Sequence, residues 1–516
     1  MIAKTFSIIP FGYSGIVIEI EGIKSQGLPV FNIVGMASKT VSEARERVKS
    51  AIRSSGFIFP DQKLTVNLAP ADLEKSGTQL DLPIAINTLI ISQQLLQQDI
   101  ENTVFIGELS LDGSLRPVPG IINVVEKARE AGFQRIFLPS KNFTQASLIS
   151  GIEIIPAKTL LEIYLHLKHQ QLIPIPKAVV KNTGTDSEKS DFSTIYGQEL
   201  AKRALTIAVA GRHNIILSGP PGTGKTALAK SALSLLPPLS IAEQISITKI
   251  HSLSHDTTEI IAERPFRSPH HSCSMVSLIG GGAKAKPGEI SLAHLGVLFL
   301  DELLEYPRAS LEALRQPLED HQISISRADR KITYPANFML IATMNPCPCG
   351  YLGDPVHPCT CTETQIRNYQ KKLSGPLLDR IDLFVDVSRI DPSRIIDLSG
   401  THNQVSEKVE QPNNHISDVV KNTVTETLEL QKHRYGDSNV TNASLSATQI
   451  NTFANLSISA KKFLDKTANS LNLSARSYLK VIRVARTIAD LDQSLEIKPG
   501  HLAEALTFRK KTPKTP

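Results

Sequence analysis

The sequence predicts a multidomain α/β protein, with an α+β domain first, an α/β core second and a helical domain last. Three observations predict this organisation. The 516 residues exceed what one hydrophobic core can organise. The middle of the chain alternates apolar, strand-like runs with helical segments, which is typical of a parallel sheet with crossover helices. Polar segments at 169–191 and 397–415 predict linkers, and they delimit domains at 1–168, 192–396 and 416–510.

The outer segments have different patterns. The first mixes strand-like runs such as IVIEIEG and KLTVNLAP with the helical stretch TVSEARERVKSAIRSSG. The last is mostly helical, and SARSYLKVIRVARTIADL is its clearest amphipathic stretch.

Four cations of this stretch share about one third of the helical circumference, at roughly 100° per residue. They are Arg476, Lys480, Arg483 and Arg486. This basic face could meet a nucleotide, a neighbouring subunit or DNA.

Composition and charge narrow the class of protein. Apolar residues make up 41% of the chain and charged residues 21%, as in ordinary globular proteins. We expect a cytoplasmic protein without a membrane partner, because there is no membrane-spanning run, no signal-peptide pattern and only five cysteines. The net charge of +6 comes entirely from residues 416–516, which carry 15 basic and 9 acidic side chains. This excess is either an electrostatic footprint for nucleic acid or a solvated basic face.

A glycine-rich loop in the core predicts a nucleotide site. The stretch NIILSGPPGTGKTALAKSAL joins a β-rich run to a helix through GPPGTGKT, which fits the Walker A pattern in full. Glycines let backbone N–H groups approach phosphates, and the N-terminus of the next helix adds a favourable dipole. We expect Lys225 to reach the β- and γ-phosphates of ATP and the Thr226 hydroxyl to bind Mg²⁺. The predicted loop consists of Gly219, Pro220, Pro221, Gly222, Thr223, Gly224, Lys225 and Thr226.

Polar residues at the ends of other apolar runs suit the same site. In GVLFLDELLEY, Asp301 is expected to hold the Mg²⁺ with its water shell, and Glu302 to polarise the attacking water. Asn345 in FMLIATMNP could orient the same water. LSGPLLDRID places Arg380 just before a strand, where ring ATPases keep the arginine that enters the neighbour's γ-phosphate site. The alternative is an exposed arginine in a salt bridge.

Two basic segments are candidates for contact with DNA. The first follows the glycines at 280–282 with Lys284 and Lys286, which predicts a mobile basic loop. In related ring ATPases an insert at this place points into a central pore. The second segment, HQISISRADRKITYP, alternates as a β-hairpin does and resembles the presensor hairpin of translocating helicases. Its tip carries the cations Arg327, Arg330 and Lys331. They could contact phosphates without reading sequence, or could be solvated surface charges.

Four of the five cysteines lie in one loop, with the spacing C-x-C-x9-C-x-C. They are Cys347, Cys349, Cys359 and Cys361. Four thiolates on one loop fit tetrahedral Zn²⁺. Pairs of the form C-x-C are less typical of zinc than C-x2-C, so reduced unliganded thiols and a redox role stay open. Because the loop follows Asn345 and precedes Arg380, our hypothesis is that zinc stiffens the link between them.

These motifs, with YGQELAKRAL, FRSPHHSCSMVSLIGGG and PGEISLAHLG, resemble the YifB/ComM family of magnesium-chelatase-like AAA+ ATPases over nearly the whole chain. The resemblance implies a P-loop AAA+ core with a helical C-terminal lid domain. It also implies a homo-hexameric DNA helicase that uses ATP and Mg²⁺ and promotes branch migration of recombination intermediates during natural transformation. Its partners would be single-stranded, duplex or branched DNA and recombination proteins. The residues implied are a sensor-2 arginine, Arg476, and an adenine pocket of Ile195, Tyr196, Gly197 and Gln198.

The same ATPase core is compatible with a different function. Magnesium chelatase and MoxR-like ATPases share this core, so a remodelling chaperone or a metal-insertion subunit is the alternative to a DNA helicase.

The first segment resembles the proteolytic domain of Lon through VNLAPADLEKSGTQLDLPIAI and FIGELSLDGSLRPVPGIINVVEKAREAGF. Lon needs a serine nucleophile that is activated by a lysine. In this chain the serine position falls on Gln79 and the lysine position on Ile122, and neither side chain can attack a carbonyl or accept a proton. The expectation is a Lon-like domain that lacks the catalytic dyad and binds DNA or assists assembly. Ser76 could restore a protease only if this pairing is wrong by three residues.

Overall fold

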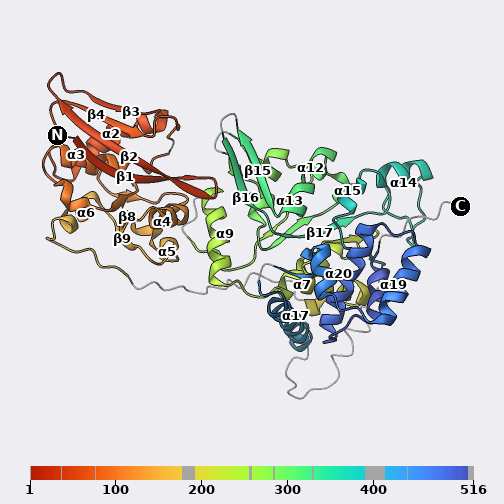
Figure 1. The fold of residues 1–516 in the computed structure, drawn as a ribbon. Coiled ribbons are helices and arrows are strands. Elements are labelled where there is room, and N and C mark those ends of the chain that lie inside the picture. Colours follow the sequence, from red (N-terminus) through yellow and green to blue (C-terminus); the bar gives the residue numbers. More distant parts are fainter. Residues whose placement is uncertain are drawn as a thin grey trace, which may run out of the picture.

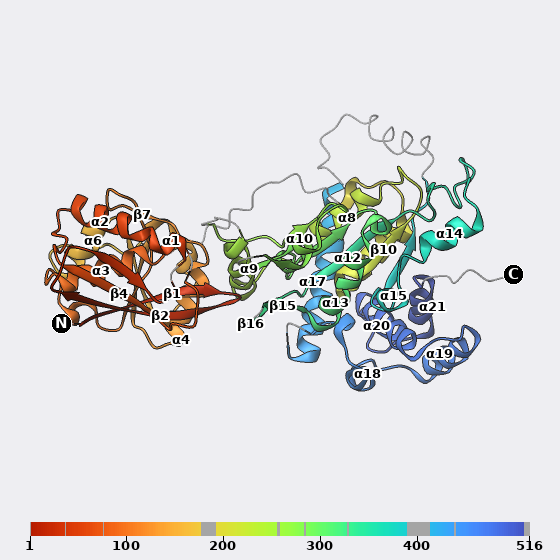
Figure 2. The same cartoon turned by 90° about the horizontal axis from the view of Figure 1, so that it is seen from above.

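The computed structural model describes residues 2–36, 38–75, 77–176, 192–254, 259–282, 285–327, 330–389, 413–437 and 440–509. The chain forms an N-terminal α+β domain and a second body that unites the α/β core with the C-terminal helices (Figures 1 and 2). Most of the two predicted linkers, including their boundaries with the core, lies outside the described ranges. No helix within those ranges is both long and apolar enough to cross a membrane.

The N-terminal domain is built on a seven-stranded mixed sheet with the order β3-β4-β2-β1-β5-β8-β9. Its strands are β1 (Ile2–Phe11), β2 (Ser14–Ser25), β3 (Phe31–Val34), β4 (Lys63–Ala69), β5 (Thr103–Phe105), β8 (Arg135–Pro139) and β9 (Glu153–Ala157), and a separate small hairpin joins β6 (Glu108–Leu109) to β7 (Leu115–Arg116). The predicted strand IVIEIEG lies within β2, and KLTVNLAP matches β4 except for its final proline. Neighbouring residues of β1 point to opposite faces, so Ile8 and Ile9 are buried in different apolar clusters.

Helices cover both faces of this sheet. They are α1 (Lys39–Ser42), α2 (Ala44–Ser54), α3 (Asp81–Ile91), α4 (Ile121–Glu130), α5 (Phe143–Ala146) and α6 (Leu160–Leu167). Helices α2, α3 and α6 pack in the cluster that contains Ile9, whereas α4 packs in the cluster that contains Ile8. Every residue of α3 is buried, as its nearly continuous apolar sequence DLPIAINTLII requires.

The core is a five-stranded parallel sheet with the order β11-β14-β17-β10-β18. Its strands are β10 (Ile215–Ser218), β11 (Phe266–Arg267), β14 (Val297–Leu300), β17 (Met339–Met344) and β18 (Leu383–Asp386). Because side chains alternate, β14 sends Phe299 to one buried cluster and Leu298 to another on the opposite face. A sheet buried on both faces explains why these strands read as unbroken apolar runs.

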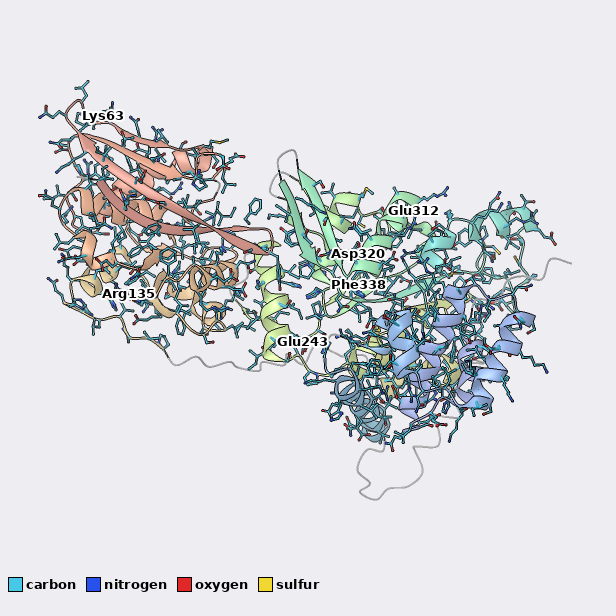
Figure 3. The ribbon with its side chains drawn as sticks, viewed as in Figure 1. Lys63, Arg135, Glu243, Glu312, Asp320 and Phe338 are labelled. Atoms are coloured by element: carbon cyan, nitrogen blue, oxygen red, sulfur yellow. The ribbon has the colours of Figure 1, made fainter. Side chains whose placement is uncertain are left out.

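Helices and two hairpins complete the core. The helices are α7 (Glu199–Gly211), α8 (Lys225–Leu235), α9 (Ile241–Ser254), α10 (Met275–Ile279), α11 (Glu289–Leu292), α12 (Arg308–Ala313), α13 (Arg315–Asp320), α14 (Glu363–Gln370) and α15 (Gly375–Leu378). The hairpins pair β12 (Gly280–Gly281) with β13 (Lys286–Pro287), and β15 (Gln322–Arg327) with β16 (Arg330–Pro335). Asp320 and Phe338 flank the longer hairpin where it leaves the core (Figure 3).

The C-terminal helices share one hydrophobic core with the sheet. They are α17 (Asn413–Tyr435), α18 (Ala447–Phe453), α19 (Ile458–Ser470), α20 (Ala475–Leu491) and α21 (Pro499–Thr507). Leu217 of β10 and Val484 of α20 belong to the same buried cluster. Polar contacts reinforce the union, since His213 Nε2 lies 2.8 Å from Thr487 Oγ1 and Gln431 Nε2 donates to the Ala210 carbonyl at 2.7 Å.

Helix α20 corrects one interpretation of its cations. Arg486 is only 1% exposed and pairs with Asp490, so it is not part of a surface for DNA. Lys480 Nζ donates to the carbonyl of Ile381 at 2.6 Å and fastens the helix to the core. Hydrogen-bond acceptors and carboxylates inside the protein can therefore stabilise buried cations, and the spacing of charges in the sequence does not reveal this burial.

Helix α9 connects the N-terminal domain to the core (Figure 2). Lys249 Nζ lies 2.5 Å from Glu126 Oε2 on α4 and 3.9 Å from the centre of the Tyr13 ring. The Tyr13 hydroxyl in turn lies 2.7 Å from Ser246 Oγ. These contacts tie both the β1–β2 turn and α4 to one helix of the core.

Candidate active site

The glycine-rich loop follows β10 and leads into α8, as its sequence predicts. Gly222 and Gly224 have φ values of 78° and 80°, which few residues other than glycine adopt. A Cβ built on either residue meets no atom within 4 Å, so there is open space over the loop for a phosphate chain. Gly219 is different, because a Cβ there would lie 2.2 Å from the Val387 carbonyl oxygen. Close packing against Val387 therefore requires a glycine at position 219.

Lys225 lies at the centre of this loop. Its Nζ donates to the carbonyls of Gly219 and Pro220, at 2.6 and 2.8 Å, and lies 3.4 Å from Asn345 Oδ1. Burial lowers its pKa because it penalises the ammonium form, and the carboxylates of Asp301 and Glu302 oppose this shift. A phosphate chain would replace two neutral carbonyls with charged oxygens, which bind an ammonium group more strongly.

Asp301 and Glu302 stand at the end of β14, next to α8. Thr226 Oγ1 donates to Asp301 Oδ2 at 3.2 Å, so the two expected Mg²⁺ ligands already lie together. Thr343 on β17 donates its hydroxyl to the other carboxylate oxygen of Asp301 and accepts the Glu302 N–H at 3.1 Å. A hydroxyl beside a carboxylate supplies the hard oxygen ligands that Mg²⁺ prefers. These residues fit Mg²⁺ bound to a nucleotide.

The predicted adenine pocket lies at the start of α7. Gly197 and Gln198 both have positive φ, and Gln198 Nε2 donates to the Ser388 carbonyl at 2.6 Å. Ile195 packs against the main core, whereas Tyr196 is 42% exposed. This turn therefore connects the chain before α7 with the chain that follows β18.

Arg380 and Arg476 meet at one carboxylate of their own chain. Arg380 donates to Glu319 on α13 and, at 2.7 Å, to the Pro376 carbonyl. Arg476 lies 3.7 Å from Glu319 and 3.6 Å from Asp379. The hydrogen bonds and ion pairs of these two arginines in the described residues include none to the Walker A loop.

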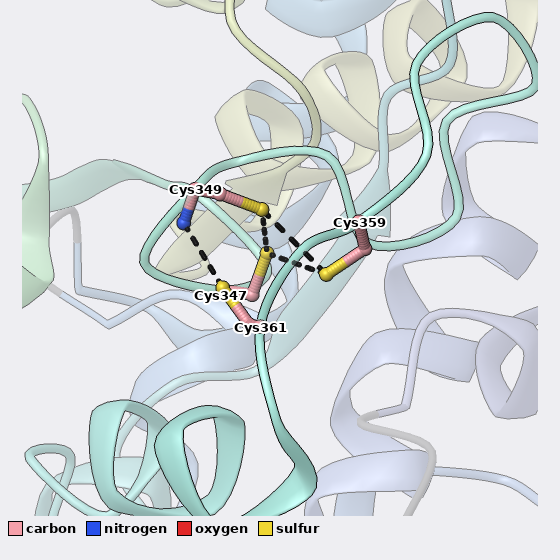
Figure 4. A group of neighbouring side chains, drawn as sticks. All are labelled: Cys347, Cys349, Cys359 and Cys361. Atoms are coloured by element: carbon pink, nitrogen blue, oxygen red, sulfur yellow. Dashed lines mark hydrogen bonds between the residues drawn. The ribbon is translucent and has the colours of Figure 1, made fainter.

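The four cysteines of the loop form a compact cluster (Figure 4). Their sulfur atoms all lie within 4.8 Å of one another. The sulfur of Cys347 lies 3.4 Å from that of Cys349, and the sulfur of Cys359 lies 3.6 Å from both. Tetrahedral zinc with Zn–S bonds of 2.3 Å needs S–S separations of about 3.8 Å. Backbone N–H groups of Tyr351 and Thr360 lower the pKa of Cys349 to about 5, whereas burial and the neighbouring sulfur atoms raise the pKa of Cys359 and Cys361, so one thiolate forms here readily.

The cysteine cluster lies against the Walker A loop. A Cβ built on Gly350 would come within 2.8 Å of Pro221 Cδ, so the two loops are in close contact there. The same Cβ would be 3.9 Å from Asn345 Cγ. On the other side, Gln370 Nε2 of α14 donates to the Pro346 carbonyl at 3.0 Å. The cluster therefore bridges the nucleotide loop and the helix that leads toward Arg380.

The candidate DNA contacts divide into described and undescribed residues. Lys286 and Lys331 are exposed on β13 and β16. Gly280 and Gly281 pair with Pro287 and Lys286 in a short β-hairpin, and the mobility predicted for this segment stays a prediction. Lys284 lies outside the described residues. The hairpin expected at 321–335 is present, with Arg327 paired to Arg330 in its backbone register, although these two side chains are not described.

The two residues that we pair with the Lon dyad are both buried. Ile122 is fully buried in the apolar cluster beneath α4, and Gln79 is 6% exposed. Lys75 is also buried, and its amine donates to the Gly35 carbonyl at 3.0 Å and to the Pro70 carbonyl. Ser76 lies outside the described residues.

Sequence reasoning missed three residues of the site. Thr343 lies in β17, two positions before Asn345, which directly follows the strand, so alternation along this stretch could have found it. Glu319 and His271 carry no local signal, because they come from distant parts of the chain. His271 Nδ1 lies 3.7 Å from Glu302 Oε2.

Comparison with protein families gives three matches along the chain. "Subunit ChlI of Mg-chelatase" matches residues 20–142, "Magnesium chelatase, subunit ChlI" matches 191–395, and "Magnesium chelatase, subunit ChlI C-terminal" matches 414–509. These matches cover the N-terminal domain, the core and the C-terminal helices in turn. They confirm the predicted α/β architecture.

Whole-length relatives agree with these matches. The chain is 42% identical to the competence protein ComM of Haemophilus influenzae over 514 residues, which cover 98% of this chain and 97% of ComM. It is 41% identical to YifB of Escherichia coli over 495 residues, 95% of this chain and 94% of YifB. An archaeal Lon protease of Methanocaldococcus jannaschii is 29% identical over 157 residues, 29% of this chain and 24% of that protein. The chain is thus an AAA+ ATPase of the magnesium-chelatase type, and it belongs to the YifB/ComM family.

Proposed function

We propose that this protein is an ATP-driven, hexameric DNA helicase that promotes branch migration of recombination intermediates during natural transformation. The substrate would be single-stranded, duplex or branched DNA, and the cofactors ATP and Mg²⁺. ATP bound at the Walker A loop would be hydrolysed with water polarised by Glu302 and oriented by Asn345. The identity of 42% with ComM, a competence protein, supports a role in natural transformation.

The observation that carries the proposal is the direct connection between the basic hairpin and the nucleotide site. Strand β16 continues through Phe338 into β17 (Figure 3). Asn345 directly follows β17, and its Oδ1 lies 3.4 Å from Lys225 Nζ. The hairpin side chains Ile325 and Ile332 are buried in the same cluster as Leu300 of β14. If loss of the γ-phosphate displaces the end of the sheet, the hairpin packed against that sheet would therefore move with it.

The two arginines support assembly into a ring. Arg380 and Arg476 meet at Glu319 and bond no residue of the Walker A loop among the described residues. Arg476 is 54% exposed, and Arg380, which is 13% exposed, lies beside it. Such a pair would suit the γ-phosphate of a neighbouring subunit once Arg380 leaves Glu319, and repeated head-to-tail contacts of this kind close into a ring.

We expect the hairpin cations to be needed for unwinding and not for hydrolysis. Replacing Arg327, Arg330 and Lys331 together with alanine removes three phosphate contacts at the tip and leaves the strands that build the hairpin. Unwinding of a forked DNA should be lost while basal ATPase is preserved. Strand-displacement and phosphate-release assays on the same preparation measure both.

A charge-matched control separates this effect from overall charge. Lys461, Lys462 and Lys466 are exposed on α19, and their triple alanine variant changes the net charge by the same amount. It should unwind DNA normally. Loss of unwinding in the control alone would place the DNA path along the C-terminal helices and contradict the proposed hairpin contact.

The magnesium-chelatase matches favour a second candidate, a metal-insertion or protein-remodelling ATPase. ATPase rates with single-stranded DNA, with duplex DNA and with an unfolded protein distinguish the two. Stimulation by the protein and by neither DNA would favour the second candidate.

We also propose that the cysteine cluster holds one structural Zn²⁺ bound by Cys347, Cys349, Cys359 and Cys361. When bound, the ion would fix the loop that contacts Pro221 and α14. Its charge would also relieve the crowding of four sulfur atoms within 4.8 Å.

Metal analysis tests this assignment. We expect about one zinc per chain in the wild-type protein and less than half of that in Cys359→Ser, with a lower melting temperature, because metal bound only to the folded state stabilises it. Cys273→Ser is the matched control, since this fifth cysteine lies outside the cluster. Wild-type protein purified without chelators and free of zinc would contradict the assignment.

A further inference from the structure

The carboxylate of Glu319, near the end of α13, holds both arginines of the proposed ring contact. Arg380 donates a guanidinium N–H to Glu319 Oε2, and a guanidinium nitrogen of Arg476 lies 3.7 Å from the other oxygen, Oε1. The hydrogen bond from Arg380 lowers the pKa of Glu319, and the charge of Arg476 adds to this effect. Glu319 therefore presents two charged oxygens to the two arginines, as a γ-phosphate would.

This contact is one that a nucleotide can break. Glu319 and Arg476 are 53% and 54% exposed, and ion pairs open to water contribute little free energy. Arginine binds phosphate through the same paired N–H groups that it offers to a carboxylate, and a γ-phosphate carries more charge. ATP in a neighbouring site would therefore take both arginines from Glu319.

Glu319 lies at the base of the longer hairpin. Between α13 and β15 there is a single residue, His321, whose left-handed backbone with φ of 53° ends the helix. The His321 N–H donates to the Pro317 carbonyl at 3.1 Å, and its own carbonyl accepts the N–H of Ala336 at 2.8 Å. Because Ala336 directly follows β16, this residue joins the end of α13 to both strands of the hairpin.

Apolar packing makes the same connection. Leu318 of α13 packs against the buried cluster that contains Ile323 of β15 and Tyr334 of β16. The longer hairpin leaves the core beside the neighbouring residue Asp320 (Figure 3). Close-packed elements transmit a displacement instead of absorbing it. A force on the side chain of Glu319 therefore reaches the hairpin.

We propose that Glu319 is a positioning residue that couples the hairpin to the nucleotide of the neighbouring subunit. The proposal rests on the ring and the DNA-dependent function proposed above. While the neighbouring site holds no γ-phosphate, Glu319 binds Arg380 and Arg476 and the base of the hairpin is held beside them. When a γ-phosphate takes the arginines, Glu319 is released and the hairpin changes position. The hairpin thus responds to its own nucleotide through β17 and to the neighbour's nucleotide through Glu319.

The number of base pairs unwound per ATP by Glu319→Gln tests the proposal. Glutamine keeps the shape of the side chain and removes its charge, so the arginines are held weakly whatever the neighbouring site contains. We expect this number to fall by about two- to five-fold, the range that loss of an exposed ion pair allows, with ATP turnover at saturating protein and DNA within about two-fold of the wild type. Strand-displacement and phosphate-release assays on the same preparation measure both. An unchanged number of base pairs per ATP, or a loss of hydrolysis as large as the loss of unwinding, would overturn the proposal.

Asp320→Asn is the matched control. Asp320 is the next residue of the same helix, is exposed, and carries the same charge. The control should unwind as many base pairs per ATP as the wild type, and an equal fall in both variants would overturn the specific role of Glu319. A wild-type protein that hydrolyses ATP and unwinds no DNA would contradict the proposed function itself. A normal yield from Glu319→Gln, in a protein that does unwind DNA, would contradict only the role of Glu319.

Discussion

Replacing Arg380 with alanine is expected to lower ATP hydrolysis by about 10³-fold or more and to leave ATP binding intact. An arginine that enters a neighbour's site stabilises the charge that develops on the γ-phosphate during transfer. In its own chain Arg380 pairs with Glu319, and its Nε atom is buried without a hydrogen-bond partner in the described structure. Steady-state phosphate release and equilibrium binding of a fluorescent ATP analogue measure the two effects separately.

Mixing two inactive variants tests whether Arg380 acts between subunits. Glu302→Gln subunits keep Arg380, and Arg380→Ala subunits keep Glu302. In a random equimolar ring, about a quarter of the interfaces combine one intact residue from each side, so hydrolysis should reappear on mixing. A mixture no more active than its components would contradict action between subunits. Arg367→Ala, at an exposed position on α14, is the control and should hydrolyse ATP normally.

Glu302→Gln is expected to slow hydrolysis by about 10²- to 10⁴-fold, the usual contribution of a general base. Glutamine has nearly the same shape as glutamate but cannot accept the proton of the attacking water. The carboxylate of Asp301 and the loop around Lys225 remain, so ATP and Mg²⁺ should still bind. Single-turnover hydrolysis with radiolabelled ATP measures the chemical step directly.

A neighbouring glutamate provides the control for this substitution. Glu305 lies in the same short turn and accepts a hydrogen bond from the Tyr369 hydroxyl at 3.1 Å. Glu305→Gln should therefore hydrolyse ATP at close to the wild-type rate. Full turnover by Glu302→Gln would remove its role in polarising water. A loss in Glu305→Gln as large as that in Glu302→Gln would point to disturbed folding of the turn.

Local sequence patterns predicted most of the core correctly. The run NIILS, the glycines and the helix after them form β10, the loop and α8. Alternation in HQISISRADRKITYP predicted the pair of β15 and β16. Such patterns succeed because glycine conformations, strand alternation and helix starts depend on residues only a few positions apart.

The same reasoning failed where side chains meet distant partners. The sequence leaves the basic face of α20 open to a nucleotide, a neighbouring subunit or DNA, yet Arg486 is buried against Asp490 and Lys480 donates to the carbonyl of Ile381. Nor does any pattern indicate that the C-terminal helices share a core with β10. Charge and apolar periodicity show which faces a helix has, but not what covers them.

By itself, then, the sequence determined the family, the order of the domains and the loop that suits ATP, because each is written in short contiguous motifs. Only the tertiary structure decided that Arg380 and Arg476 meet at Glu319, that the cysteine loop contacts Pro221, and that His271 reaches Glu302. These contacts join residues separated by long stretches of chain. They form because the whole chain buries its apolar surface in one arrangement, which brings otherwise unrelated loops together.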